Sequence, residues 1–386
     1  MLDISRCRYL VVGAGFFGST VAERIASELG ERVVVIDKHD HIGGHSYSEK
    51  DPETGVECHK YGSHIFHTKH EEVWEYITKF TRFNSYRHQV FTKYLGKTYT
   101  MPVNLHTINN FYGTDLTPGE VENFLRKDIE REGITDPKNL EEKAITLIGR
   151  PLYEAFVRGY TIKQWNMDPK DLPAYIITRL PFRRTLKTDY FDDPHQGIPV
   201  DGYGAVFRRI LDNPRIELHL NTDFFDLRDQ LPPECTVIFT GPMDRFFDYK
   251  HGRLGWRTLK FEVERHNMEY YQGNSVINYA EAEVPYTRIH EFKHYHPERE
   301  HRNDATIIFK EFSKDVTSED EELYYPVTTK QNDALYATYK EEAAEQKNVL
   351  FGGRLGGYKY YDMDTTILAA LNFFEENIRP RHMAKS

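Results

Sequence analysis

The feature that most constrains this fold is a glycine-rich turn near the N-terminus, Gly13-Ala-Gly15-Phe-Phe-Gly18. It stands between a β-branched run at residues 9–12 and an apolar-periodic stretch at residues 16–29, and a second β-branched run follows at residues 33–36. This spacing predicts a strand, a helix and a strand, with glycines that permit a tight turn and close backbone approach to a pyrophosphate. Asp37 ends the second run, where an acid accepts hydrogen bonds from an adenosine ribose. We therefore predict a dinucleotide-binding unit; the alternative is a glycine turn with a structural role only.

Two further glycine pairs bear on which dinucleotide is bound. Gly43-Gly44 follows the second predicted strand, and Gly352-Gly353 precedes Arg354 near the C-terminus. Each pair permits a close backbone crossing, and a cofactor held from both chain ends is typical of FAD rather than NAD. The alternative is that both pairs are ordinary turns.

Charge and cysteine content argue against several classes of protein. The formal net charge of −10 argues against nucleic-acid binding, because affinity for a phosphate backbone needs a basic face. Three widely spaced cysteines indicate neither a disulfide framework nor a thiolate metal site, which fits a reducing cytoplasm. The N-terminus shows no apolar signal-peptide core, and no apolar run reaches bilayer-spanning length. We expect a cytoplasmic protein without membrane insertion, in which local arginines hold any anionic ligand.

Periodicity along the chain predicts an α/β fold in which a Rossmann-like FAD-binding domain is interrupted by a helical domain and an antiparallel β-sheet domain. Apolar residues recur at helical spacing between positions 117 and 180, whereas β-rich runs alternate with turn residues between 257 and 312. The expected boundaries are 1–80 with 196–248 and 345–386 for the FAD-binding domain, 100–182 for the helical substrate domain, and 83–99 with 183–195 and 249–344 for the antiparallel sheet domain.

One segment, His290-Glu291-Phe-Lys-His294, matches a zinc-hydrolase pattern. That pattern binds zinc only on a helix, where both imidazoles share a face. Here β-forming residues surround the histidines, so we predict surface or sheet histidines rather than a metal site. His59, His64, His67 and His70 are a second candidate metal site, but no cysteine supports that interpretation, so we predict no metal there.

Longer and less common strings carry a resemblance to a known family. They are His59-Lys-Tyr-Gly-Ser-His64-Ile-Phe-His67-Thr, Tyr153-Glu-Ala-Phe-Val-Arg-Gly-Tyr160-Thr-Ile-Lys-Gln-Trp165, Pro285-Tyr-Thr-Arg288, Tyr324-Tyr325-Pro326, and Gly352-Gly-Arg354 through Tyr360-Tyr-Asp362-Met. Through them the chain closely resembles the UDP-galactopyranose mutases, nearly from end to end.

The resemblance implies a flavin reaction without net redox change. N5 of reduced FAD would attack the anomeric carbon of the sugar, UDP would leave, and the sugar ring would open and reclose on a different hydroxyl. UDP-galactopyranose and UDP-galactofuranose would thus interconvert, supplying galactofuranose for cell-surface glycans. The partners implied are these two nucleotide sugars, a flavin reductant such as NAD(P)H, and a second copy of the chain in a homodimer.

The family pattern also implies roles for individual residues. The predicted catalytic residues are Arg179 and Arg288, which would clamp the diphosphate with Arg179 on a mobile segment, and His64 and His67, which would lie against the flavin. The predicted substrate-binding residues are Phe156, Tyr160, Trp165, Arg179, Tyr190, Arg257, Arg288, Tyr325 and Tyr360. The predicted cofactor-binding residues are Gly13, Gly15, Phe17, Gly18, Asp37, Lys38, Gly43, Gly44, His45, His64, Gly353, Arg354, Tyr360, Asp362 and Met363.

The chemistry of these residue types agrees with the roles. Arginine presents a planar, permanently charged fork to a diphosphate, and tyrosine offers an aromatic face together with a hydroxyl. The alternative for each residue is a solvated helix end or packing within a sheet.

Other functions stay open from the sequence alone. An FAD-dependent oxidoreductase of the amine-oxidase type would share the cofactor domain, and a non-catalytic flavoprotein would share the nucleotide-sugar contacts. A mutase for a related nucleotide sugar is a third alternative. His45, Ser63, Lys187 and Val157 depart from the family pattern near the ligand, which bears on the choice of sugar and nucleotide rather than on the reaction.

Overall fold

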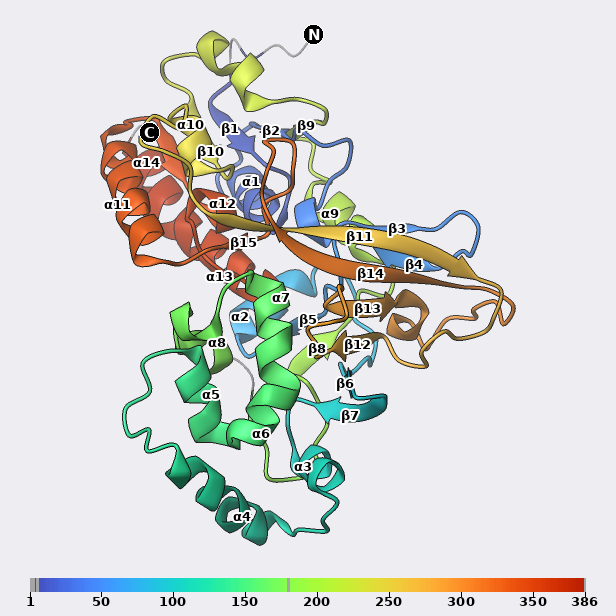
Figure 1. The fold of residues 1–386 in the computed structure, drawn as a ribbon. Helices are drawn as coiled ribbons and strands as arrows, with labels where there is room; N and C mark the ends of the chain where they lie inside the picture. The colour runs from blue at the N-terminus through green and yellow to red at the C-terminus, as the bar shows by residue number, and fades with distance from the viewer. Residues whose placement is uncertain (1–3, 5–6, 179–180, 385–386) are drawn as a thin grey trace.

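A computed structural model describes residues 4, 7–178 and 181–384 of the chain. Figure 1 shows a sheet with its helices at one end of the molecule, a group of helices at the other, and a second sheet whose longest strands extend to one side. The predicted α/β fold class is confirmed.

The first sheet is parallel and contains the predicted opening unit. Its five strands run in the order β16-β10-β1-β2-β9, and each neighbouring pair is parallel. The strands are β1 (Tyr9–Val12), β2 (Val33–Ile36), β9 (Ile216–His219), β10 (Thr236–Phe239) and β16 (Val349–Phe351).

Helices cover both faces of this sheet. One face buries Val11 and Val35 against α1 (Phe16–Glu28) and the end of α13 (Met363–Phe373). The opposite face buries Leu10 and Val34 in a cluster that includes Tyr339 of α11 (Lys330–Glu345). Successive strand residues point to opposite faces, so a sheet covered on both sides needs the unbroken apolar runs seen in the sequence.

The second sheet has seven strands in the order β15-β11-β14-β13-β12-β6-β7. Its pairs are antiparallel, as predicted, except that β6 runs parallel to β12. A parallel pair needs a long connection, and residues 95–275 separate these two strands along the chain. The strands are β6 (Val90–Tyr94), β7 (Lys97–Met101), β11 (Trp256–His266), β12 (Val276–Tyr279), β13 (Arg288–Glu291), β14 (Thr306–Asp315) and β15 (Tyr325–Pro326).

Helices dominate the chain that follows β7, from residue 105 to residue 178. They are α3 (Leu105–Tyr112), α4 (Pro118–Arg131), α5 (Leu140–Ile148), α6 (Arg150–Tyr153), α7 (Gly159–Trp165) and α8 (Tyr175–Thr178). Their apolar faces share one core with β6, β7 and β12, which fixes the helical region against the second sheet. Within the described ranges, no helix has both the length and the apolar character needed to cross a membrane.

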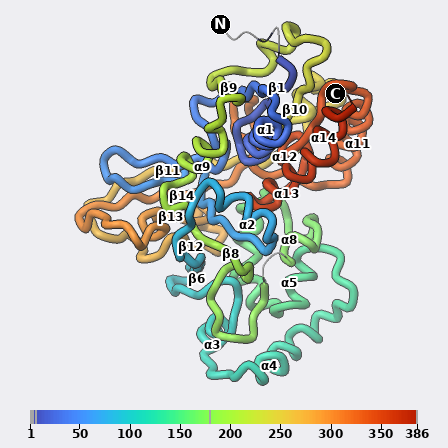
Figure 2. Tube along the Cα trace, turned by 180° about the vertical axis from the view of Figure 1, so that it is seen from behind, coloured from blue at the N-terminus to red at the C-terminus, as the bar shows by residue number. Residues whose placement is uncertain are grey.

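Shorter elements join these parts. The remaining helices are α2 (Glu71–Ile77), α9 (Tyr203–Ile210), α10 (Met243–Phe246), α12 (Gly353–Gly356) and α14 (Arg379–Met383), and the remaining strands are β3 (Ser48–Lys50), β4 (Glu57–His59), β5 (Phe66–Thr68) and β8 (His195–Gly197). Both views, Figures 1 and 2, place α2 and the β5–β8 pair between the first sheet and the helical region. The predicted domain boundaries stay predictions.

Candidate active site

A cavity of about 630 Å³ opens at the carboxyl ends of the first sheet's strands. It is lined by the turn after β1, by the ends of β2, β9 and β10, and by residues 316–323, which connect β14 to β15 of the second sheet. All of the predicted cofactor residues except Tyr360 and Asp362 line it. Ligands of open α/β sheets bind at this edge, so the cavity has the position expected for a dinucleotide.

The three glycines of the first turn differ in what surrounds them. A Cβ added to Gly13 would lie 2.1 Å from Thr240 Oγ1, and one added to Gly18 would lie 1.9 Å from the carbonyl oxygen of Gly13. A Cβ on Gly15 would meet only Gly44 Cα, at 3.9 Å. The protein therefore fills the space beside Gly13 and Gly18, whereas the space between Gly15 and Gly44 suits a phosphate at the N-terminus of α1.

Asp37, which follows β2, is held by hydrogen bonds from the glycine turn after β1 and from His39. Its carboxylate accepts hydrogen bonds from the Ala14 N–H at 2.7 Å and from the N–H and ring Nδ1 of His39 at 3.0 and 2.7 Å. Burial alone would raise the pKa of Asp37, but these hydrogen bonds outweigh it and the pKa is lowered. Asp37 is therefore a carboxylate at the edge of the cavity, as a ribose contact requires.

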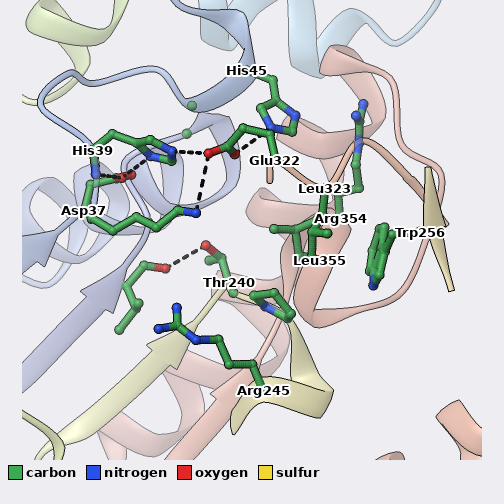
Figure 3. A pocket seen from close by; sticks show the side chains of 18 of the residues that line it. Asp37, His39, His45, Thr240, Arg245, Trp256, Glu322, Leu323, Arg354 and Leu355 are labelled. Atoms are coloured by element: carbon green, nitrogen blue, oxygen red, sulfur yellow. Dashed lines mark hydrogen bonds and ion pairs between the residues drawn. The ribbon is translucent and has the colours of Figure 1, made fainter. Parts of the chain in front are cut away.

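Glu322 joins the second sheet to the cofactor side of the cavity (Figure 3). Its carboxylate lies 2.7 Å from His39 Nε2, 3.3 Å from His45 Nε2 and 3.4 Å from Lys38 Nζ. Burial alone would lower the pKa of His39, but its hydrogen bonds to Asp37 and Glu322 raise that pKa to about 9. The imidazolium therefore bridges two carboxylates across the rim of the cavity.

His64 presents a neutral imidazole to the cavity. Burial lowers its pKa to about 3, and its Nδ1 lies 2.7 Å from the carbonyl oxygen of Gly62. A carbonyl can only accept, so Nδ1 carries the proton and Nε2 keeps its lone pair. His67 lies outside the cavity lining: its Nδ1 is 2.6 Å from Asp193 Oδ2, and its ring stacks on Phe191 at 3.7 Å.

Four of the predicted substrate residues gather beside the cavity. The rings of Tyr325 and Tyr360 stack with centroids 5.2 Å apart, and the Arg354 guanidinium lies 5.8 Å from the Tyr360 centroid. Burial raises the pKa of Tyr160 and of Tyr325, and Arg288 is close enough to oppose both shifts. Arg288, Tyr160, Tyr325 and Tyr360 thus form a site with one permanent positive charge and several hydroxyls.

The structure does not bring all the predicted substrate residues to this site. Phe156 is 4% exposed and packs in an aromatic cluster with Tyr94 and Tyr99. Arg257 is 1% exposed and donates to the Gln164 carbonyl oxygen and to Ser313, both at 3.1 Å, besides pairing with Asp315. Buried in this way, both side chains connect elements of the fold, and their substrate contacts stay predictions.

The other predicted substrate residues lie at the margin of the described site. Trp165 ends α7 and packs partly buried against the helical core, and Tyr190 packs against His88 and Phe191. Arg179 lies outside the described residues.

The segment that matches the zinc-hydrolase pattern is not a helix through both histidines. His290 and Glu291 end β13, and His294 lies in the short 3-10 turn that follows. Glu291 accepts hydrogen bonds from the N–H groups of Tyr271 and Gln272 at 2.8 and 2.9 Å. His290 is therefore a buried sheet histidine, one of the two predicted alternatives, and the Glu291 carboxylate caps a loop.

Glu322, Thr240 and Arg245 line the cavity but were not predicted from the sequence. Thr240 follows β10 as Gly13 follows β1, and these strands are neighbours. The rule that ligands meet the carboxyl ends of parallel strands could have pointed to Thr240. No sequence signal identifies Glu322, because it reaches the cavity from a connection of the second sheet.

A glycine-lined cavity at the strand ends of a doubly covered parallel sheet, beside an arginine and tyrosine cluster, defines a nucleotide-binding enzyme of the Rossmann class. Comparison with known proteins makes this specific. Residues 155–360 match the UDP-galactopyranose mutase family, and residues 11–80 match the NAD(P)-binding Rossmann-like domain. The chain belongs to the UDP-galactopyranose mutase family, which makes it an isomerase and confirms the predicted resemblance.

Two relatives have nearly the same identity to the chain. A probable UDP-galactopyranose mutase from Klebsiella pneumoniae is 41% identical over 95% of this chain and 94% of its own. A dTDP-fucopyranose mutase from Escherichia coli is 40% identical over 94% of this chain and 96% of its own.

Solved structures share the fold at low sequence identity. A reduced UDP-galactopyranose mutase superimposes with a TM-score of 0.75 at 15% identity, covering 98% of this chain and 95% of the other. A putative protoporphyrinogen oxidase from Exiguobacterium has a TM-score of 0.65 at 12% identity, covering 97% and 99% of the two chains. An oxidoreductase can therefore share this architecture, so the reaction must be argued from the site.

Proposed function

We propose that this protein interconverts UDP-galactopyranose and UDP-galactofuranose, with FAD as a cofactor that is active when reduced. The observation that carries the proposal is the position of Arg288, Tyr160 and Tyr325 beside a cavity shaped for a dinucleotide. That arrangement would bring a nucleotide sugar against the inner end of the cofactor.

The cavity residues fit FAD. The open space between Gly15 and Gly44 receives the pyrophosphate at the N-terminus of α1, and Asp37 offers its carboxylate to the ribose. Arg354 and His64 line the cavity on the side of the arginine and tyrosine cluster. When bound, the reduced flavin supplies the nucleophile for the anomeric carbon of the sugar, without net redox change.

The residues of the chain bind and orient the substrate around that step. Arg288, together with Arg179, neutralises the diphosphate and stabilises it as it departs, while tyrosine hydroxyls donate to its oxygens. Tyr160 stacks on the uracil base, with Trp165 nearby. The unprotonated Nε2 of His64 accepts a hydrogen bond without adding positive charge beside the flavin.

A second candidate function is the same ring isomerisation of a related nucleotide sugar. The identity to the dTDP-fucopyranose mutase is within one per cent of that to the UDP-galactopyranose mutase, 40% against 41%. Both reactions would use the same cofactor and diphosphate residues. The substrates differ at the base and at the sugar.

One assay separates these functions. Dithionite-reduced protein is incubated with UDP-galactofuranose and, separately, with dTDP-fucofuranose, and the products are resolved by chromatography, with oxidised protein as the control. We expect conversion of the UDP sugar only by reduced protein and without consumption of reductant per turnover. Preferred conversion of the dTDP sugar supports the second candidate, and stoichiometric consumption of reductant indicates an oxidoreductase.

Three further proposals concern the surroundings of the enzyme. We infer that the protein acts in the cytoplasm, that a nucleotide reductant such as NAD(P)H keeps its flavin reduced, and that two copies assemble as a homodimer. The cysteine content supports the cytoplasmic location, and the family resemblance supports the reductant and the homodimer.

A further inference from the structure

Five side chains form a continuous hydrogen-bonded chain behind the substrate site. It runs from Tyr295 to Ser63, from Ser63 to His290 Nδ1, from His290 Nε2 to Glu311 at 2.9 Å, and ends where Arg288 Nε donates to Glu311 at 2.8 Å. Tyr295 and His290 are fully buried and Glu311 is 1% exposed, whereas the Arg288 side chain is 25% exposed. The chain is therefore closed to solvent at Tyr295, is partly exposed at Ser63, and reaches the substrate site at Arg288.

Each proton in this chain has one consistent position. Burial and the pairing with Arg288 act in opposite directions on Glu311, and the net result lowers its pKa to about 2, so the carboxylate only accepts. His290 must then donate from Nε2, and because burial lowers its pKa it is neutral and accepts at Nδ1. Ser63 therefore donates to Nδ1 and accepts from the Tyr295 hydroxyl, which burial keeps protonated by raising its pKa.

The order of donors and acceptors along these hydrogen bonds determines how Arg288 is held. Its Nε donates to Glu311, and in the described part of the chain Nη1 and Nη2 make no other hydrogen bond. The two terminal nitrogens therefore remain for an anionic ligand, in a plane set by the Glu311 carboxylate. Since one carboxylate oxygen is held by His290, the orientation of that plane depends on the His290 ring and hence on Ser63.

The same serine belongs to the segment that lines the cofactor cavity. Ser63 lies between Gly62, whose carbonyl oxygen holds His64, and His64 itself. A Cβ on Gly62, which has φ +93°, would lie 3.5 Å from Glu311 Oε2, so the carboxylate packs directly against this turn. The turn thus contacts the cofactor cavity on one side and Glu311, which holds Arg288, on the other.

We infer that Ser63 and Tyr295 are positioning residues for Arg288, acting through His290 and Glu311 to orient its terminal nitrogens toward the diphosphate of the substrate. This inference rests on the proposed function only in assigning a diphosphate to Arg288. A positioning role predicts a binding result that a packing role does not. Loss of this hydrogen-bonded chain should weaken the contact with the diphosphate and leave the contact with the nucleoside unchanged.

The test compares binding of UDP with binding of uridine by calorimetry, at matched FAD content. Ser63→Ala removes the donor to His290 and the acceptor for Tyr295, so we expect UDP to bind about tenfold more weakly while uridine affinity stays constant. Tyr295→Phe leaves Ser63 able to donate to His290, so a weakening of about threefold is expected. Ser63→Thr keeps the hydroxyl and should restore most of the UDP affinity.

Ser48→Ala is the control variant, because Ser48 is a buried serine that donates to the Glu57 carboxylate at 2.7 Å and is not part of the hydrogen-bonded chain from Tyr295 to Arg288. It should leave the ratio of UDP to uridine affinity unchanged. Wild-type affinity for UDP in both Ser63→Ala and Tyr295→Phe overturns the inference, as does an equal loss of UDP and uridine affinity. Wild-type protein that binds neither compound contradicts the proposed function itself.

Discussion

Replacing each glycine of the first turn by alanine should separate structural glycines from the one that makes room for the cofactor. A Cβ on Gly18 falls 1.9 Å from a backbone oxygen, and real Cβ atoms essentially never come within 3.0 Å of another atom, so α1 must move by about 1 Å. Gly13 has φ +108° and would place its Cβ 2.1 Å from Thr240 Oγ1. We expect each replacement to cost about 3 kcal/mol or more, which for a chain of this length lowers Tm by roughly 4 °C or more.

Gly15→Ala should behave differently. Gly15 has an extended backbone with φ −80° that any residue adopts, and its added methyl meets only Gly44 Cα at 3.9 Å. The cofactor-free protein should therefore lose at most about 1 kcal/mol, the difference between glycine and alanine at a helix N-cap. The methyl nevertheless occupies the approach of the pyrophosphate, and losing two charge-assisted hydrogen bonds at about 1.5–3 kcal/mol each weakens FAD binding a hundredfold or more.

The assay measures Tm of each cofactor-free variant and titrates FAD by its absorbance and fluorescence. Cofactor-free proteins must be compared, because bound FAD would itself raise Tm. The reasoning is refuted if Gly15→Ala binds FAD like the wild type, or if it destabilises the cofactor-free protein as much as Gly18→Ala does.

Three other predictions concern charged groups. Lys163 Nζ lies 2.7–3.0 Å from four backbone oxygens between β12 and β13, so Lys163→Met should cost about 3–5 kcal/mol in denaturant unfolding; an unchanged midpoint would contradict this. Arg288→Ala should slow turnover by about thirtyfold to a thousandfold, with Arg288→Lys partly restoring it and FAD content unchanged; near-normal turnover would show that the diphosphate is held elsewhere. Because the pKa of His39 is raised from 6.5 to about 9, its contribution to stability is complete below pH 6.5 and is lost as pH rises through 9. Unfolding followed from pH 6 to 10 should show this loss in the wild type and not in His39→Gln, and parallel curves would contradict it.

Features that depend on residues close together in the chain could be predicted from the amino-acid sequence. The turn from Gly13 to Gly18, its flanking strands and helix, and the position of Asp37 follow from spacing within one βαβ unit. The sequence strings around His64, Tyr160 and Arg354 indicated the family, and the comparisons confirm it. These signals are readable because a turn or a helix face brings together residues only a few positions apart.

Contacts between residues far apart in the chain became evident only from the three-dimensional structure. Ser63 and His290 are 227 positions apart, and His39 and Glu322 are 283 apart, yet each pair is hydrogen-bonded. It also showed that Arg257, expected in the cleft, is 1% exposed and bonded within the fold. Periodicity cannot supply such contacts, because it states which face of an element is buried but not which other element covers that face.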